Sequence, residues 1–365
     1  MTSWKTYRLG DIAKFQTGKL NSNAAVENGK YPFFTCSPNT LAIDNYAFDK
    51  EAILLAGNNA EGNFAIKYYK GKFNAYQRTY IIEADNDICD IKFLFYALKL
   101  CLHQFKLMSQ GTSTKFLTAV ILNNFEISLP SLEEQRRIAG ILSAIDDKIE
   151  NNRRINTNLE LQAQALFGKW CESCSKNITI KELADNILDY TPNANSEVVL
   201  LNSSDVTQGV FAKLPLVSNV NLKGQFKKRF QKGDILYSEI RPRNKHYAYC
   251  YFDSDRYIAS TRLIVLRGKK EKIVSNTLLY QYLISQNVFE EFTLKTETRS
   301  GTFPQGNYQD LSSIVVPYSD NQREIAGVLD SIYKRIWHNN TEIETLATLR
   351  DTLLPKLMNG EIKTE

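Results

Sequence analysis

Four short clusters of polar and basic side chains hold the residues of this sequence that could do chemistry. They occupy residues 74–79, 109–115, 241–245 and 298–302. Arginine and lysine can pair with guanine edges, asparagine and glutamine with adenine edges, and small hydroxyl residues beside glycine with phosphate. The clusters therefore suit contact with a nucleic acid, although any one basic surface residue is more often simply solvated. The candidate contacts are Asn74, Gln77, Arg78, Gly111, Thr112, Ser113, Lys115, Arg241, Arg243, Lys245, Arg299, Ser300 and Thr302.

No motif in the chain indicates catalysis. An amine methyltransferase needs an Asn- or Asp-Pro-Pro-aromatic loop and a glycine-rich cofactor turn, and neither string occurs; a phosphate-binding P-loop is also missing. The run Asp146-Asp147-Lys148 falls on the polar flank of a predicted helix, where a solvated face is the ordinary explanation. Three histidines and no recognisable serine or cysteine nucleophile leave hydrolysis unsupported. We therefore expect a non-enzyme without a cofactor of its own.

The cysteines and the apolar runs bound the class of protein further. Six cysteines are scattered along the chain, and we expect them to be free thiols. Cys171 and Cys174 form a C-x-x-C pair, but no second pair follows at zinc-ribbon spacing, so we expect no metal site. The first residues lack the apolar run of a signal peptide, and no later stretch approaches about 18 consecutive apolar residues. We expect a folded cytoplasmic protein.

The positive charge is concentrated in two blocks that contain the four clusters. Residues 1–129 carry 14 basic and 11 acidic side chains, and residues 175–316 carry 19 and 14. The stretches 130–174 and 317–365 have a slight acidic excess, although the whole chain has a net charge of +5. This distribution favours polyanion binding by the two blocks rather than by the segments that follow them.

An internal duplication predicts the elements that hold these blocks. The segment that opens at Pro130 returns 187 positions later at Pro317. In register, Gln135, Arg136, Ile138, Ala139, Gly140, Leu142, Ile145, Ile149, Asn152 and Leu159 recur as Gln322, Arg323, Ile325, Ala326, Gly327, Leu329, Ile332, Ile336, Asn339 and Leu346. Each copy begins with proline and acidic residues and then spaces its apolar positions alternately four and three apart. This pattern predicts a long helix of coiled-coil type in each copy.

The two predicted helices share one kind of seam. Its members are Ile138, Leu142, Ile145, Ile149 and Asn152 in the first helix and Ile325, Leu329, Ile332, Ile336 and Asn339 in the second. A seam asparagine lowers stability but fixes register and orientation, so we expect Asn152 and Asn339 to align the helices, antiparallel about a pseudo-twofold axis. About 33 residues of helix would span about 50 Å, which is enough to separate two domains.

The blocks in front of the helices are predicted to be diverged α+β domains. Leu94, Tyr96 and Phe105 match residues 184 positions later in stretches with helical spacing, and short β-branched or aromatic runs bounded by turn residues indicate strands. The chain would then divide into a first domain at 1–129, a first long helix at 130–174, a second domain at 175–316, and a second long helix with a closing segment at 317–365.

This plan resembles the specificity (S) subunits of type I restriction-modification systems over the whole chain. The resemblance is carried by the opening Trp4-Lys-Thr-Tyr-Arg-Leu-Gly-Asp11, by the helix start Pro130-Ser-Leu-Glu-Glu-Gln-Arg-Arg-Ile-Ala139, and by the ending Leu353-Leu-Pro-Lys-Leu-Met-Asn-Gly-Glu-Ile362. The second helix departs from it by lacking a glutamate before Gln322, and the second domain lacks a strong copy of Leu9-Gly-Asp-Ile12. These departures affect the symmetry expected of partner docking.

The resemblance implies a function in DNA recognition without catalysis. Each target-recognition domain would bind one half of a bipartite double-stranded DNA target, and the helices would set the spacer between the halves. Two methylation subunits would dock on the chain, and a restriction complex would add two motor-nuclease subunits. S-adenosylmethionine, ATP and Mg²⁺ are expected on these partners only. The alternative is a non-catalytic coiled-coil adaptor whose two domains bind proteins, which predicts no affinity for DNA.

Overall fold

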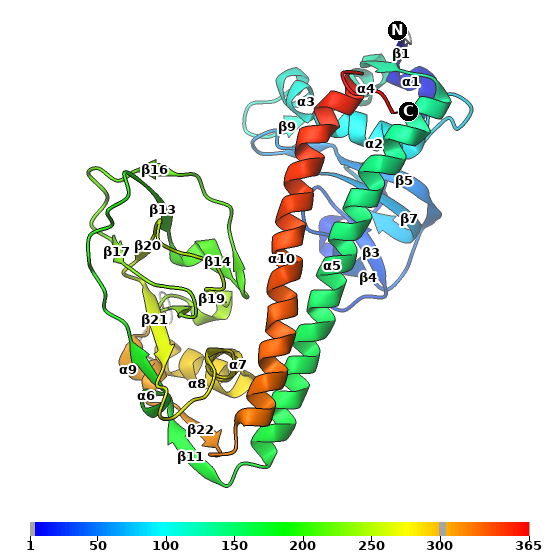
Figure 1. Ribbon diagram of the computed structural model, residues 1–365. Coiled ribbons are helices and arrows are strands. Elements are labelled where there is room, and N and C mark those ends of the chain that lie inside the picture. Colours follow the sequence, from blue (N-terminus) through cyan, green and yellow to red (C-terminus); the bar gives the residue numbers. More distant parts are fainter. Residues whose placement is uncertain (1–3, 299–303, 365) are drawn as a thin grey trace. The chain divides into compact units, whose positions relative to one another are not determined.

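The computed structural model describes residues 4–298 and 304–364 and consists of two compact units. Unit 1 is formed by Met1–Glu150 with Ile343–Glu365, and unit 2 by Asn151–Glu342. The two longest elements, α5 (Leu132–Glu172) and α10 (Arg323–Met358), each contribute a segment to both units (Figure 1). Because packing defines these units, the four-part division drawn from the sequence stays a prediction.

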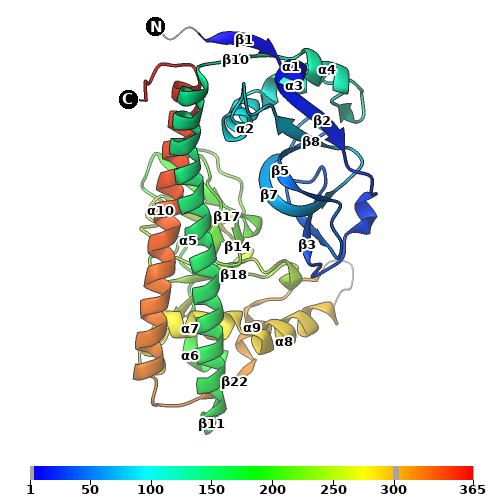
Figure 2. The same ribbon diagram turned by 90° about the vertical axis from the view of Figure 1, so that its right-hand side faces the viewer.

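Unit 1 is built on one curved six-stranded sheet covered by helices (Figure 2). The sheet runs β2 (Ala13–Thr17), β8 (Thr79–Ala84), β5 (Phe48–Ala56), β7 (Ile66–Ala75), β3 (Tyr31–Phe34) and β4 (Leu41–Ile43), with β3 and β7 as its parallel pair. Its helices are α1 (Leu9–Ile12), α2 (Ile91–Leu100), α3 (Leu102–Met108) and α4 (Ala119–Asn124), with a 3-10 turn η1 (Ser22–Ala24). Two short pairs complete it, namely β1 (Lys5–Arg8) with β10 (Glu126–Leu129) and β6 (Asn58–Asn59) with β9 (Lys115–Phe116).

Unit 2 has two four-stranded sheets. One runs β12 (Ala184–Asn186), β21 (Leu263–Gly268), β18 (Ile235–Ser238) and β19 (Tyr247–Tyr249); the other runs β16 (Val217–Ser218), β13 (Glu197–Leu201), β20 (Tyr257–Ser260) and β17 (Phe226–Lys228). The pairs β11 (Lys176–Thr179) with β22 (Val315–Tyr318) and β14 (Val206–Thr207) with β15 (Val210–Phe211) complete the strands. Its helices are α6 (Ile180–Leu183), α7 (Asn276–Ile284), α8 (Gln286–Glu297) and α9 (Tyr308–Ser312), with 3-10 turns η2 (Ser203–Asp205) and η3 (Pro242–Asn244).

The two units repeat one internal plan. Strands β2-β8-β5-β7 of unit 1 and β12-β21-β18-β19 of unit 2 follow each other in the same spatial order. In both, a short helix precedes the first of these strands, a helix pair follows the sheet, and an antiparallel strand pair lies directly before a long helix. The prediction of two related α+β domains and two long helices is therefore confirmed.

Two buried glutamines bind the start of each long helix to its own unit. Gln135 accepts a hydrogen bond from the backbone N–H of Asp90 at 2.9 Å and donates one to the carbonyl of Ile88 at 3.1 Å. Gln322 forms the corresponding pair of bonds, at 3.2 and 2.9 Å, with the segment before α7. The two side chains are only 1% and 2% exposed. The repeated glutamine therefore supplies hydrogen bonds to partly buried backbone groups of its own unit.

Within each unit the α5 and α10 segments pair in opposite directions. In unit 2, Asn152 Nδ2 donates to Glu342 Oε2 at 2.8 Å, and Asn339 Nδ2 donates to Asn156 Oδ1 at 2.7 Å. Asn156 in turn donates to Asn340 Oδ1 at 2.7 Å. Both seam asparagines are fully buried, and each bonds to a neighbour of the other rather than to the other itself.

Most apolar seam residues join the core of their own unit, Ile138 and Leu142 in unit 1 and Ile325, Leu329 and Ile336 in unit 2. The buried members are Ile138, Leu142, Ile149, Ile325, Leu329 and Ile336, and the half-buried ones are Ile145 and Ile332. In unit 1 the core also takes in Leu354 and Leu357 near the end of α10. Each long helix is thus held by core side chains of its unit as well as by the other long helix.

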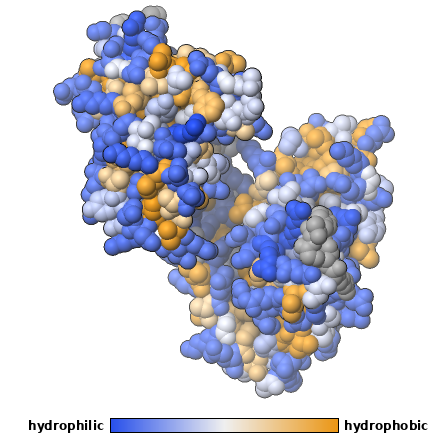
Figure 3. Space-filling model, turned by 180° about the vertical axis from the view of Figure 1, so that it is seen from behind, coloured by the Kyte–Doolittle hydropathy of each residue, from blue (hydrophilic) through white to orange (hydrophobic). Residues whose placement is uncertain are grey.

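The face shown in Figure 3 is largely hydrophilic, with apolar side chains scattered among polar ones. No helix in the described part of the chain is long and apolar enough to span a bilayer.

We expect Gln135→Leu to destabilise unit 1 by about 2–4 kcal/mol, because the backbone N–H of Asp90 and the carbonyls of Ile88 and Pro130 lose this hydrogen-bond partner, at up to about 1–3 kcal/mol each. Thermal and denaturant unfolding would measure the change. Arg136→Gln is the matched control on the exposed neighbouring position and should shift the unfolding free energy by less than about 0.5 kcal/mol. Equal effects of the two substitutions would show that the amide does not hold the helix.

Candidate nucleic-acid interface

The two clusters predicted in the first block lie together at one corner of unit 1. One is in the turn between β7 and β8, and the other is the loop that leads into β9. A cavity of about 510 Å³ is lined by Gln77 and Arg78 from the first and by Gln110, Gly111 and Phe116 from the second. Residues more than 30 positions apart in the sequence thus form one concave surface.

The loop 110–116 is closed by its own backbone. Gln110 and Phe116 exchange two backbone hydrogen bonds of 3.1 and 2.8 Å. Gly111 has a φ of +105°, and a Cβ there would lie 2.1 Å from a carbonyl oxygen of the same loop. Only glycine fits this position without strain. The closed loop leaves Thr112 and Ser113 exposed at its tip, where their hydroxyl groups can reach a ligand.

Arg78 is the cation best placed in this corner. Its side chain is exposed, and its Cζ lies 5.2 Å from the centroid of the Phe116 ring. Such an exposed cation–π contact contributes about 0.5–1 kcal/mol, so it orients the guanidinium while leaving its donors open. Gln77 beside it is exposed and donates to Asn21 Oδ1 at 2.9 Å. Lys115 is half-buried, and the described residues place no carboxylate in an ion pair with it or with Arg78.

Asn74 occupies a different environment from the other predicted contacts. It is 4% exposed, its Nδ2 donates to Asn45 Oδ1 at 3.0 Å, and its Oδ1 accepts from the backbone N–H of Ala75 at 3.0 Å. An enclosed amide with both ends bonded inside the unit holds β7 in place. Its position therefore does not support the prediction that Asn74 contacts a base.

The loop 241–245 of unit 2 has an unusual backbone. Arg241 and Lys245, on either side of η3, have φ values of +46° and +53°, which side chains other than glycine rarely adopt. The N–H of Arg241 donates to the carbonyl of Pro304 at 2.9 Å. This bond brings the loop to the segment that follows the second predicted cluster. Arg299, Ser300 and Thr302 of that cluster lie outside the described residues.

The two other cations of this loop contact α8. Arg243 forms a two-pronged ion pair with Glu297, with distances of 2.5 and 2.7 Å, and this bond lowers the pKa of the glutamate. The Arg243 side chain is 70% exposed, and exposed pairs contribute little to stability, so the arginine can exchange this partner for another anion. Lys245 is half-buried, with its Nζ 5.1 Å from the centroid of the Phe289 ring.

Arg262 of unit 2 occupies the position that Arg78 occupies in unit 1, and it is not among the candidate contacts predicted from the sequence. Its carbonyl accepts from Glu239 N–H at 3.0 Å, as the carbonyl of Arg78 accepts from Gly57 N–H at 2.8 Å. Both arginines are exposed, and each directly precedes a central strand of its sheet. Burial raises the pKa of Glu239, and the positive charge of Arg262 opposes that rise. The offset of 184 residues between Arg78 and Arg262 was the available signal, because the helices of the two blocks repeat at the same offset.

The loop that follows the other central strand is also equivalent in the two units. Asn58 pairs with Phe116 in unit 1, and Ile240 pairs with Gln305 in unit 2. By this pairing, Asn59 in unit 1 corresponds to Arg241 in unit 2. The sequence prediction missed both asparagines, since the run around them contains neither a basic residue nor a hydroxyl.

Nothing in the described part of the chain forms a metal centre, since no group of three His, Cys, Asp or Glu side chains gathers there. Burial raises the pKa of the Cys171 thiol to about 12, with a smaller contribution from Cys174. A thiol with a raised pKa is a poor metal ligand and a poor nucleophile.

Comparisons with known proteins show which family the chain is similar to. A family model described as type I restriction modification DNA specificity domain matches residues 1–161 and 175–348. The type I restriction enzyme EcoDI specificity subunit of Escherichia coli is 28% identical and is aligned over 99% of this chain and 89% of its own length. The HindI specificity subunit of Haemophilus influenzae is 36% identical over 49% of this chain and 39% of its own.

A solved structure shares the fold. The S subunit of a type I restriction-modification system from M. genitalium has a TM-score of 0.67 and 18% identity, covering 98% of this chain and 96% of its own. The resemblance noted in the sequence is confirmed by these matches. With two copies of the specificity domain that together span most of its length, the chain belongs to the family of type I restriction-modification specificity subunits.

Proposed function

We propose that each unit reads one half of a bipartite DNA target through its loop corner. In unit 1 the loop corner is formed by residues 57–59, 76–78 and 110–116, and in unit 2 by residues 239–245, Arg262 and 304–306. The observation that carries this proposal is that the same backbone bonds place an exposed arginine at both corners. Arginine with an adjacent amide is the set of donors that distinguishes base pairs in the major groove.

The charge distribution supports the same assignment. Both blocks that carry a loop corner have a positive excess, and the segments with the long helices have none. Phosphate contacts add affinity without sequence information, and base-edge contacts add specificity. We assign the first role to Lys115, Lys245 and the hydroxyl groups of the 110–116 loop, and the second to Arg78 and Arg262.

The long helices would set the length of the spacer DNA between the two half-sites and would bind the partner subunits. Exposed apolar side chains remain on α5 at Ile141, Leu161 and Leu166, and on α10 at Val328 and Leu349. Such residues on a helix that already has a partner along its seam favour a further protein contact. We assign them to the methylation subunits, with S-adenosylmethionine there and with ATP and Mg²⁺ on motor-nuclease subunits where these assemble. The chain itself would supply no catalytic group.

Replacing either corner arginine should weaken recognition of one half-site only. In a complex reconstituted with its methylation subunits, we expect Arg78→Ala and Arg262→Ala each to lower affinity for the bipartite target by about 5- to 100-fold and to relax one base position. Competition binding with single-base variants of the target would measure this. Arg256→Ala removes an exposed charge of unit 2 outside the loop corner and should change little. Loss of discrimination in both halves from one substitution would contradict the assignment.

The salt dependence of binding separates this function from the adaptor alternative. For a DNA-recognition subunit that contacts several phosphates, the logarithm of the DNA-binding constant falls steeply and linearly with the logarithm of the salt concentration. An adaptor shows no such DNA affinity. A complex without preference for any bipartite sequence over random duplex would overturn the proposal.

The spacer length should follow the length of the helix pair. Seven residues inserted after Glu150 and seven after Glu342 add one heptad to each helix and preserve the seam. The added rise is about 10 Å, or about three base pairs. Methylation profiling by long-read sequencing should show both half-sites unchanged and the spacer lengthened by about that amount. An unchanged spacer would refute the role of the helices, and a same-length replacement of one heptad serves as the control.

A further inference from the structure

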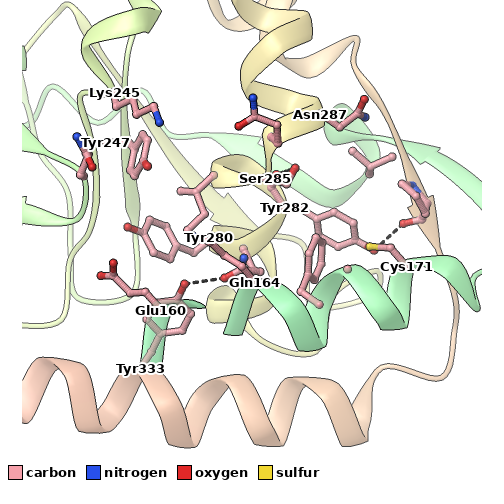
Figure 4. A pocket seen from close by; sticks show the side chains of 18 residues that line it. Glu160, Gln164, Cys171, Lys245, Tyr247, Tyr280, Tyr282, Ser285, Asn287 and Tyr333 are labelled. Atoms are coloured by element: carbon pink, nitrogen blue, oxygen red, sulfur yellow. Dashed lines mark hydrogen bonds between the residues drawn. The ribbon is translucent and has the colours of Figure 1, made fainter. Parts of the chain in front are cut away.

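Unit 2 contains a polar cavity that lies beside its loop corner and shares one residue, Lys245, with it. Its volume is about 510 Å³, and it lies between α5, α7, α10 and the loop that leads into β19 (Figure 4). A second cavity of about 350 Å³ adjoins it and shares part of its wall. The side chains that matter here are Glu160 and Gln164 of α5, Tyr280 of α7, Tyr333 of α10, and Tyr247 of β19.

Glu160 brings an unpaired carboxylate into this cavity. It is half-buried, and the described residues give it neither an ion pair nor a hydrogen-bond donor. Burial raises its pKa, and burial together with the charge of Glu160 raises the pKa of Tyr247 to about 12. Figure 4 shows the carboxylate on the same side of the cavity as the hydroxyl groups of Tyr247 and Tyr280. Charged groups removed from water are normally paired, so this arrangement is incomplete.

Tyr280 adds a second polar group that has no partner. Its side chain is 4% exposed and lines both cavities, and no described residue forms a hydrogen bond with its hydroxyl group. Tyr333, by contrast, donates to Gln281 Oε1 at 2.6 Å. The Glu160 carboxylate and the phenol groups of Tyr247 and Tyr280 thus lie on the cavity wall without a hydrogen bond to a described residue, beside further polar side chains such as Gln164 and Asn287.

The other unit shows how the equivalent position is completed. Tyr96, which matches Tyr280 at the offset of 184, donates to Asp146 Oδ2 at 2.7 Å. Arg350 of α10 then pairs with Asp146 Oδ1 at 2.7 Å. A tyrosine, a carboxylate and a guanidinium thus form a closed triad inside unit 1.

Unit 2 keeps the tyrosine and a carboxylate but has lost the guanidinium. At the helix offset of 187, Asp146 corresponds to Tyr333, and Arg350 corresponds to Ala163. Glu160, one turn before Ala163, supplies the carboxylate instead. A short methyl side chain stands where unit 1 has an arginine, and the cavity occupies the neighbouring space.

We propose that this cavity is a binding site for a guanidinium group. The planar cation would donate N–H hydrogen bonds to the Glu160 carboxylate and lie against the tyrosine rings, which attract cations through their faces. Lys245, which also lines this cavity, lies over Phe289 and forms no ion pair with Glu160. The guanidinium can come from a small metabolite or from an arginine side chain of a docked protein.

Titration of the full-length chain with agmatine at pH 8 tests the site. Agmatine carries a guanidinium on an alkyl stem, and butylamine, which lacks the guanidinium, is the control ligand. We expect saturable calorimetric binding of agmatine and at least about tenfold weaker binding by Glu160→Gln, because a partly buried charge pair loses one member. Glu172→Gln, at the exposed end of the same helix, should bind as the wild type does. Thermal unfolding of each variant checks that it is folded.

Absence of saturable binding, or equal affinity in wild type and Glu160→Gln, would overturn the proposal. Repeating the titration after assembly with the methylation subunits identifies the source of the guanidinium. Loss of agmatine binding on assembly, together with weaker assembly of Glu160→Gln, assigns the site to a partner's arginine, whereas unchanged binding assigns it to a small molecule. The titration uses no DNA, so its failure would leave the proposed half-site recognition untouched.

Discussion

The fold depends on the requirement that buried backbone groups be hydrogen bonded where a long helix leaves its module. At both junctions a glutamine amide meets this requirement, because its oxygen accepts one backbone hydrogen bond while its nitrogen donates another. The junction fixes the rotation of the helix about its axis and therefore which residues face the partner helix. The seam, the asparagine contacts and the position of Glu160 all follow from this rotation.

The sequence predicted the features that periodicity and duplication encode. The 187-residue repeat gave both helices and their seam, because apolar spacing reports which side of a helix is buried. It did not give the partners of Asn152 and Asn339, since the register of an antiparallel pair depends on the whole interface. The internal hydrogen bonds of Asn74 could not be predicted for a similar reason, and its contact with DNA stays a prediction. Its partner Asn45 lies 29 residues away, and no local pattern connects the two.

The candidate contacts were chosen by the local density of polar residues. This choice included Arg78 but not Arg262. Arg78 stands in one of the polar clusters, whereas Arg262 is followed directly by an apolar strand and has only Ser260 and Thr261 before it as polar neighbours. The backbone bonds to Gly57 and Glu239 show that the two arginines occupy the same place. Position relative to a strand end was thus a better guide than composition. The offset of 184 carried that information in the sequence.

The differences between the two copies are as informative as their common frame. The bonds that shape the loop corners are kept, yet Asn58 and Asn59 of unit 1 are replaced by Ile240 and Arg241 in unit 2. A fixed frame with exchanged side chains allows two half-sites of different sequence to be read by one architecture, since hydrogen-bond donors and acceptors at the corner decide which base pair fits. The triad of Tyr96, Asp146 and Arg350 is not part of that corner, but it diverged as well. Because a half-buried carboxylate without a cation is costly, the presence of Glu160 one turn from the position that corresponds to Arg350 favours a cation supplied from outside unit 2.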